Sequence, residues 1–175
     1  ELPSKKRNKY VSQFGLSAYD ARVISDEISM ANFFEETVAN GAEAKLASNW
    51  VTSDIVGYLK SNKLSFSELQ LSPKNLAEMI NMISKNIISG KIAKEILPEL
   101  IQKNISPKKL VEEKGLAMIS DSSSILPIID ELINEHPNEV QAFKNGKTKL
   151  LGFFVGQLMK RTKGKADPKL ANKLL

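Results

Sequence analysis

Apolar residues recur every three or four positions along almost the whole chain, and the alternation of apolar and polar residues typical of half-buried strands is missing. This spacing places the apolar side chains on one face of an α-helix. With 175 residues and 42% hydrophobic content, the chain can build one sizeable core or two small ones. The sequence therefore predicts an all-α protein made of two small helical subdomains in series.

Capping residues predict where several helices begin. Ser17 is a candidate amino-terminal cap, with Asp20 three positions later as the partner in a capping box. Elsewhere a serine or aspartate precedes a proline at the first helical position, where the missing amide hydrogen is not needed. Pro98 stands inside the helical pattern of residues 91–102 and predicts a kink or an early end there. The cap-and-proline pairs are Ser72-Pro73, Ser106-Pro107 and Asp167-Pro168.

The helices expected from this pattern follow one another closely. Asn40-Gly41 ends a first helix that Ser17 begins, and Ser89-Gly90 ends the helix that Ser72 begins. A short helix after Ser106 ends at Gly115. The remaining expected helices cover about residues 42–60, 91–102, 122–135, 138–144 and 147–161, with a last one from residue 167.

Positive charge is concentrated in residues 144–175. This segment holds nine basic residues against one acid, Asp167, which gives it a charge of +8, whereas the whole chain carries +5 and the remaining residues therefore sum to −3. Such a concentration predicts an anionic partner. The basic residues are Lys144, Lys147, Lys149, Lys160, Arg161, Lys163, Lys165, Lys169 and Lys173.

A helical wheel of residues 147–161 separates two kinds of surface. Seven large apolar residues cover a broad arc and predict a core helix, while Lys149, Gly152, Gly156 and Lys160 fall together in the narrow gap that remains. One interpretation is that the glycines let an external phosphate backbone approach while the lysines hold it. The other is that the glycines admit another helix of the same domain. The apolar arc consists of Leu150, Leu151, Phe153, Phe154, Val155, Leu158 and Met159.

Beyond this helix, a cluster of cations (Lys160, Arg161, Lys163 and Lys165) adjoins the start of the last helix. Cations at a carboxyl end offset the helix dipole, and Asp167 can be an ordinary cap, but dipole compensation requires only one or two charges. The cluster therefore favours nucleic-acid contact. Because no aromatic residue lies in the exposed basic part, recognition of RNA backbone and shape is favoured over base stacking.

The residues give no sign of a catalytic or metal site. There is no cysteine, and the single histidine, His136, precedes Pro137 in an expected exposed turn without a second histidine. Adjacent acids such as Glu35-Glu36 point about 100° apart on a helix and do not converge. No apolar run approaches the roughly 20 residues that a membrane-spanning helix needs, so a soluble protein without membrane contact is expected.

The run from Gly146 to Pro168, GKTKLLGFFVGQLMKRTKGKADP, resembles the ending of the B subunit of the glutamyl/aspartyl-tRNA amidotransferase family and of the related YqeY-type proteins. Upstream segments resemble the helical region of the same family, in the same order. The opening residues 1–10 are similar to the join between the catalytic cradle and the helical part of the B subunit. The upstream segments are residues 16–21, 33–35, 49–50, 89–94 and 115–121.

This resemblance implies an organisation and a role. Residues 1–16 would be a linker from a missing amino-terminal cradle, 17–105 a helical domain and 106–175 a YqeY-type tail domain. The parent would be an ATP-dependent and Mg-dependent, glutamine-hydrolysing ligase of the bacterial cytoplasm or, less in favour, of an organelle, acting with the A and C subunits. The fragment itself would hold no cofactor and would bind the tRNA elbow, with Lys149, Gly152, Gly156, Lys160, Arg161, Lys163 and Lys165 as contact residues.

Two other functions stay open at this point. The chain can be a helical module that docks a protein partner through its basic segment and has no nucleic-acid role. It can also be a free-standing YqeY-type protein. Salt titration of tRNA binding separates the leading hypothesis from protein docking, because phosphate contacts release counterions.

Overall fold

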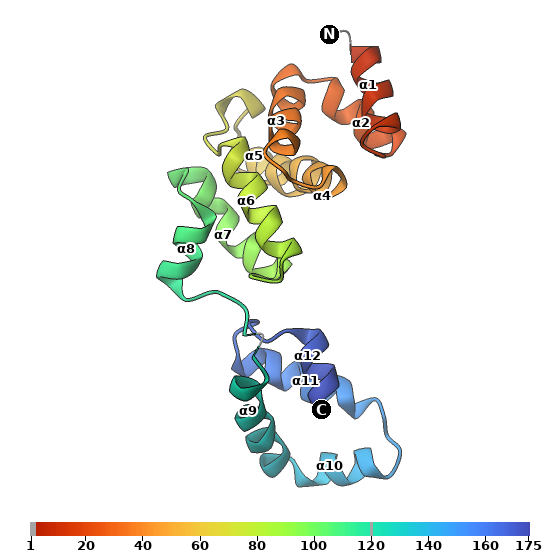
Figure 1. The fold of residues 1–175 in the computed structure, drawn as a ribbon, viewed down its shortest axis with the longest axis vertical. Coiled ribbons are helices and arrows are strands. Elements are labelled where there is room, and N and C mark those ends of the chain that lie inside the picture. Colours follow the sequence, from red (N-terminus) through yellow and green to blue (C-terminus); the bar gives the residue numbers. More distant parts are fainter. Residues whose placement is uncertain (1–2, 120) are drawn as a thin grey trace. The chain divides into compact units, whose positions relative to one another are not determined.

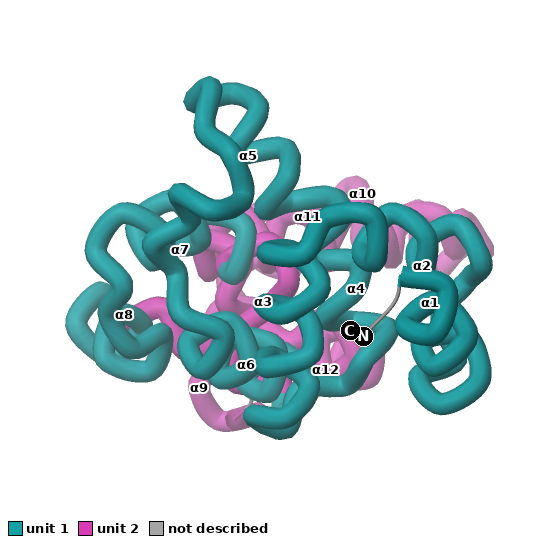
Figure 2. The backbone as a smooth tube through the Cα atoms, turned by 90° about the horizontal axis from the view of Figure 1, so that it is seen from above, with its two compact units in different colours: residues 1–85, 93–114 teal, residues 86–92, 115–175 magenta. Residues whose placement is uncertain are grey.

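The computed structural model describes residues 3–119 and 121–175, shown in Figure 1. These residues are predominantly helical, and their only extended pairing is an isolated parallel bridge between Ile119 and Ala166. The predicted all-α fold is confirmed. By contacts the chain divides into two compact units: one runs up to Lys85 and includes Ala93–Lys114, and the other comprises Asn86–Ile92 and Gly115–Leu175 (Figure 2).

The first unit contains most of the helices, and several begin at the predicted caps. The Ser17 hydroxyl accepts from the amide of Asp20 at 3.0 Å, and the Ser72 hydroxyl accepts from that of Asn75 at 3.2 Å. Its elements are α1 (Pro3–Ser12), α2 (Ala18–Ser25), α3 (Ile28–Ala39), α4 (Ala44–Asn49), a π-helical segment (Trp50–Ile55), α5 (Val56–Ser61), a 3-10 turn (Phe66–Glu68), α6 (Pro73–Ser84), most of α7 (Gly90–Lys103) and α8 (Pro107–Lys114).

Helix boundaries differ from the predictions at three places. The first expected helix is two helices, α2 and α3, because Glu27 between them is extended and Arg7 of α1 binds Asp26 at 3.0 Å. Helix α6 ends at Ser84, before the predicted Ser89-Gly90, and Asn86 takes a left-handed φ of 55°. Helix α7 runs through Pro98 as far as Lys103, so the predicted early end is wrong. Burial of the neighbouring Leu97 and Leu100 explains why the helix continues.

Residues 3–12, within the stretch predicted to be a linker, form a helix that packs on the rest of the first unit. Tyr10 of α1 is fully buried, and its ring packs edge-on against Phe34 at 5.2 Å. The Tyr10 hydroxyl donates to Glu35 of α3 at 3.0 Å, and Lys6 pairs with the same carboxylate at 3.1 Å. The described part of this stretch is therefore built into the core of the first unit.

The contact grouping also differs from the predicted ranges 17–105 and 106–175. Residues 107–114 form α8, which packs against α6 with Leu110 and Val111 buried, and so belong with the first unit. Residues 86–92 group with the second unit. The amide of Met118 donates to the carbonyl of Ile87 at 2.7 Å, which explains that grouping.

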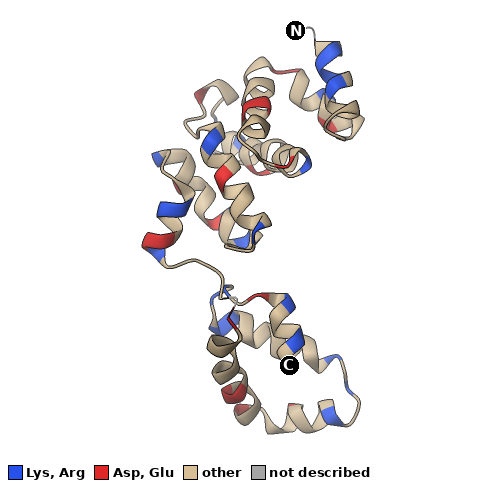
Figure 3. Cartoon of the chain, viewed as in Figure 1, with Lys and Arg blue, Asp and Glu red and all other residues tan. Residues whose placement is uncertain are grey.

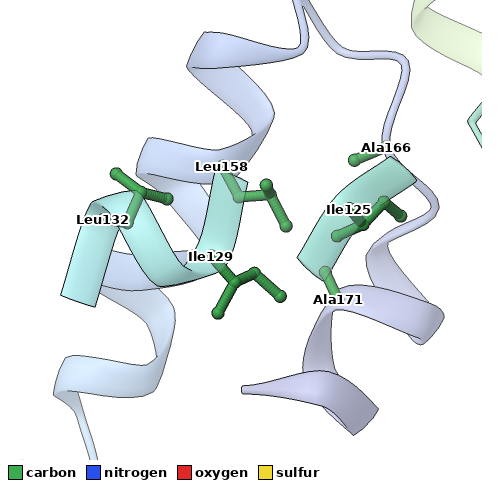
Figure 4. Close-up of a cluster of buried hydrophobic side chains, with 6 residues drawn as sticks. All are labelled: Ile125, Ile129, Leu132, Leu158, Ala166 and Ala171. Atoms are coloured by element: carbon green, nitrogen blue, oxygen red, sulfur yellow. The ribbon is translucent and has the colours of Figure 1, made fainter. Parts of the chain in front are cut away.

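The second unit consists of α9 (Ser122–Glu135), α10 (Pro137–Lys144), α11 (Leu150–Arg161) and α12 (Pro168–Leu174), together with the segments named above. Its core is small. The buried side chains face one another from α9, from α11 and from the start of the last helix (Figure 4). They are Ile125, Ile129, Leu132, Leu158, Ala166 and Ala171.

Helix α11 is less buried than predicted. Of the seven residues on its apolar arc, only Phe154 and Leu158 are buried, and the other five are half-buried. Helices α9, α10 and α12 contact α11, but a unit with so few helices cannot enclose such a broad arc. The expectation of a core helix buried around most of its circumference is therefore wrong. Among the described residues, no helix has the length and apolar character needed to cross a membrane.

Candidate nucleic-acid interface

The glycine stripe of α11, defined as Lys149, Gly152, Gly156 and Lys160, lies on an exposed face. Lys149 precedes the helix with a helical backbone (φ −60°, ψ −21°), so all four positions follow the helical wheel. Both glycines are exposed, and an added Cβ at either would meet no atom of the described chain within 4 Å. The interpretation that these glycines admit another helix of the domain is therefore wrong. The stripe is open to an external partner.

The basic residues of the stripe stand at opposite ends of α11. Lys149 precedes the first turn and Lys160 lies in the last, about 16 Å apart along the axis for a rise of 1.5 Å per residue. Exposed Lys144 and Lys147 lie before α11, and two more exposed lysines lie on α12. Figure 3 shows these blue segments in the connection before α11 and on the last helix. The charge is thus spread along the helix and concentrated at its two ends.

The loop after α11 is held by its own hydrogen bonds. Lys163 and Gly164 both have left-handed backbones, with φ of 52° and 78°. The buried Thr162 hydroxyl donates to the carbonyl of Leu158 at 2.9 Å and accepts from the amide of Ala166 at 3.2 Å. Because a glycine at position 164 takes this φ without a steric penalty, the loop can close tightly. Lys160 and Lys163 are exposed on this frame, and Lys165 is half-buried.

Backbone bonds tie the same loop to the segment before α9. The amide of Ile119 donates to the carbonyl of Lys165 at 2.7 Å, and the amide of Asp167 donates back to Ile119 at 3.3 Å. The Asp167 carboxylate accepts from the amide of Lys169 at 2.8 Å, so it is an ordinary cap of α12. The loop therefore has a fixed position within the second unit.

Arg161 is engaged within the unit. Its guanidinium donates to Glu131 at 3.1 Å and to Glu135, both on α9. The hydrogen bond to Glu135 raises the pKa of Arg161 and lowers the pKa of Glu135. By contrast, no carboxylate of the described residues lies within 4.0 Å of the ammonium groups of the four predicted contact lysines. These are Lys149, Lys160, Lys163 and Lys165.

One lysine outside the basic segment lies beside this loop. The Cδ atom of Lys91 stands 3.9 Å from the position that a Cβ on Gly164 would occupy. Counting charge along the sequence could not find Lys91, because 72 positions separate it from Lys163. Its place in the run of residues 89–94, which resembles the family, was the only signal available.

His136 does not stand in a plain exposed turn. It lies between α9 and α10, is half-buried and packs its ring edge-on against Phe153 at 5.2 Å. Phe153 offers this contact because it is half-buried and not enclosed by the core. The predicted exposure of His136 is therefore wrong, and its role here is packing.

The comparison with protein families decides which family this fold represents. Residues 32–175 match the family described as "GatB domain". The chain belongs to the GatB domain family. The resemblance deduced from the Gly146–Pro168 run is confirmed.

Similar proteins carry one description, the B subunit of aspartyl/glutamyl-tRNA(Asn/Gln) amidotransferase. The chain is 98% identical to the protein of Prochlorococcus marinus strain AS9601, 93% to that of strain MIT 9312 and 59% to that of Synechococcus sp. strain CC9605. Each match covers the whole of this chain. This GatB domain chain spans 36% of the length of the first two relatives and 35% of the third.

Proposed function

We propose that this chain is a tRNA-binding, non-catalytic part of the B subunit of an aspartyl/glutamyl-tRNA amidotransferase. The supporting observation is the open glycine stripe, whose exposed Gly152 and Gly156 lie between lysines without carboxylate partners among the described residues. Bare helix positions let a phosphate backbone come close, and ammonium groups at both ends attract it. The names of the similar proteins support tRNA as the nucleic acid.

The binding mode that fits is recognition of backbone and shape at the tRNA elbow. Lysine ammonium groups act as point charges on phosphates and do not distinguish bases. Phe153 and Phe154 are engaged with each other and with His136, so they offer no free stacking platform. Arg161 is proposed as a contact residue as well, on condition that phosphate competes with Glu131 and Glu135.

The parent protein supplies the chemistry in this proposal. It would use ATP, Mg and glutamine to convert mischarged tRNA into Gln-tRNA(Gln) or Asn-tRNA(Asn), together with the A and C subunits, in the bacterial cytoplasm. The part described here would present the tRNA body and contribute no catalytic residue. Its contribution is therefore to affinity and to selection of the correct tRNA.

The decisive experiment measures tRNA binding by the full-length protein in its assembled complex. Lys160→Glu with Lys163→Glu should weaken binding by roughly fivefold or more per lost contact at 0.15 M salt, the factor that a log-log salt slope of about 0.8 per contact gives. The slope itself should fall by about 0.7 to 0.9 per contact. Lys108→Glu, at an exposed lysine of α8 without an ion pair among the described residues, is the matched control.

If the double variant binds tRNA with unchanged affinity and salt slope, the proposal is wrong. Loss of the A or C subunit from the complex, with tRNA affinity retained by the separated full-length protein, would indicate a protein-docking module. Size-exclusion chromatography of the same variants reports that assembly directly.

A further inference from the structure

The side chain of Lys91 approaches the loop after α11, as the 3.9 Å distance from its Cδ to the Cβ position of Gly164 shows. Gly164 is buried, with the lysine stem beside it, whereas Lys91 as a residue is exposed. No carboxylate of the described residues lies within 4.0 Å of its ammonium group. Lys91 therefore adds a third cation beside Lys163 and Lys165, which flank Gly164.

This neighbourhood is built by backbone hydrogen bonds. Ile87 accepts from the amide of Met118 at 2.7 Å, and the next residue, Ile119, donates to the carbonyl of Lys165 at 2.7 Å. One short segment thus joins residues 86–92 to the loop after α11. The position of Lys91 beside Gly164 follows from this connection and does not rest on side-chain packing alone.

Helix α7 begins at the same place. The Ser89 hydroxyl accepts from the amide of Ile92 at 3.2 Å and so caps the helix. The amides of Gly90 and Lys91 lie in the first turn, where helix geometry provides no intrahelical acceptor. Gly90 is exposed, and a Cβ added there would meet nothing within 4 Å. The positively polarised end of a 14-residue helix is therefore accessible next to three lysines.

Three cations gathered around one loop, without neutralising carboxylates among the described residues, repel one another unless an anion lies between them. We infer that Lys91, Lys163 and Lys165 form one phosphate-binding site, assembled from the start of α7 and the loop after α11, that holds a backbone phosphate of tRNA. This inference rests on the proposed function and extends it to a residue outside the basic segment.

The test compares single variants of the full-length protein in its complex, with tRNA as the probe. Lys91→Glu should weaken binding by roughly fivefold or more at 0.15 M salt and lower the salt slope by about 0.7 to 0.9, as Lys163→Glu does. Lys91→Arg should restore affinity. The double variant of Lys91 and Lys163 should lose less than the product of the two single losses, because both side chains serve one phosphate.

The outcomes separate this inference from the proposed function. If Lys163→Glu weakens binding and Lys91→Glu behaves like the Lys108→Glu control, the two-segment site is wrong and the proposed function stands. If neither variant changes tRNA affinity, the proposed function itself fails. Should Lys91→Glu lower the melting temperature, the neutral variant Lys91→Gln decides by its salt slope. A slope equal to that of the unmodified protein would overturn the site.

Discussion

The guanidinium of Arg161 on α11 donates a hydrogen bond of 3.1 Å to the carboxylate of Glu131 on α9. The same guanidinium also binds Glu135, one turn further along α9. This fork connects the helix of the glycine stripe to the helix that supplies most of the small core. Arg161 consequently contributes to the arrangement of the second unit before any partner binds.

Removing both carboxylates should strengthen tRNA binding. In Glu131→Gln with Glu135→Gln, Arg161 keeps its charge, and two nearby negative charges that oppose an approaching phosphate disappear. We expect an affinity gain of roughly fivefold at 0.15 M salt if one phosphate contact is gained. Filter binding of tRNA to the full-length protein, repeated under two salt concentrations, measures it.

Asp130→Asn is the matched control, because Asp130 is an exposed acid of α9 without an ion pair among the described residues. It also removes one negative charge but releases no arginine. An equal gain from this control would show that net charge, and not Arg161, governs the effect. Reduced tRNA affinity in the double glutamine variant would show that the fork serves binding by holding α9 and α11 together.

Gly156→Leu should impair tRNA binding while leaving the fold intact. A leucine at this exposed position meets no atom of the described chain within 4 Å at its Cβ, and leucine favours the helix by up to about 1 kcal/mol over glycine. The melting temperature should therefore stay the same or rise. The bulky side chain should keep a phosphate backbone away from the stripe, which tRNA titration detects as a loss of affinity.

Gly156→Ala separates bulk from helix propensity in the same assay. Alanine gives the same kind of helix stabilisation but adds only one methyl group, so most of the tRNA affinity should remain. Loss of most thermal stability in the leucine variant would contradict the exposed position of Gly156.

Leu158→Ala should destabilise the second unit severely. Leu158 is fully buried, and truncating a buried leucine costs about 2 to 5 kcal/mol. A core of this size supplies only about 3 to 5 kcal/mol, so the second unit should largely unfold near room temperature. Leu126→Ala, at a leucine of α9 that is 42% exposed, should change little. Amide hydrogen exchange across residues 121–175 distinguishes the two variants, and equal protection in both would contradict this core.

Glu35 should make the stability of the first unit depend on pH. Burial acts to raise the pKa of Glu35, but hydrogen bonds from Lys6 and Tyr10 and the charges of Lys6 and Lys9 outweigh it, so the pKa is lowered. The charged carboxylate therefore stabilises the fold above its unfolded pKa, and this contribution disappears as pH falls through the folded value. Glu35→Gln should destabilise the protein at about pH 7, with the difference shrinking near about pH 3.

Urea unfolding of the two proteins at both pH values measures this difference. Glu36→Gln, at the neighbouring exposed position without a side-chain partner among the described residues, should leave stability unchanged at either pH. A Glu35→Gln difference of the same size at both pH values would show that shape, and not charge, matters at this position.

Local chemistry made several features of the interface predictable. Lys149, Gly152, Gly156 and Lys160 share one helix, so their common face follows from a repeat of 3.6 residues and needs no tertiary information. Whether that face is covered depends on how many helices surround α11, which a wheel cannot show. The partners of Arg161 were equally hidden, because they lie on α9, 26 and 30 positions away in the chain.

The sequence by itself determined the helices, most of their starts and the segment that carries the positive charge, because caps, prolines and apolar spacing act over three or four neighbouring residues. Tertiary structure alone decided that the glycine stripe is open, that Arg161 is bound to α9 and that Lys91 lies beside Gly164. These contacts join segments far apart in the chain, and their existence depends on how the helices pack, which no local pattern specifies.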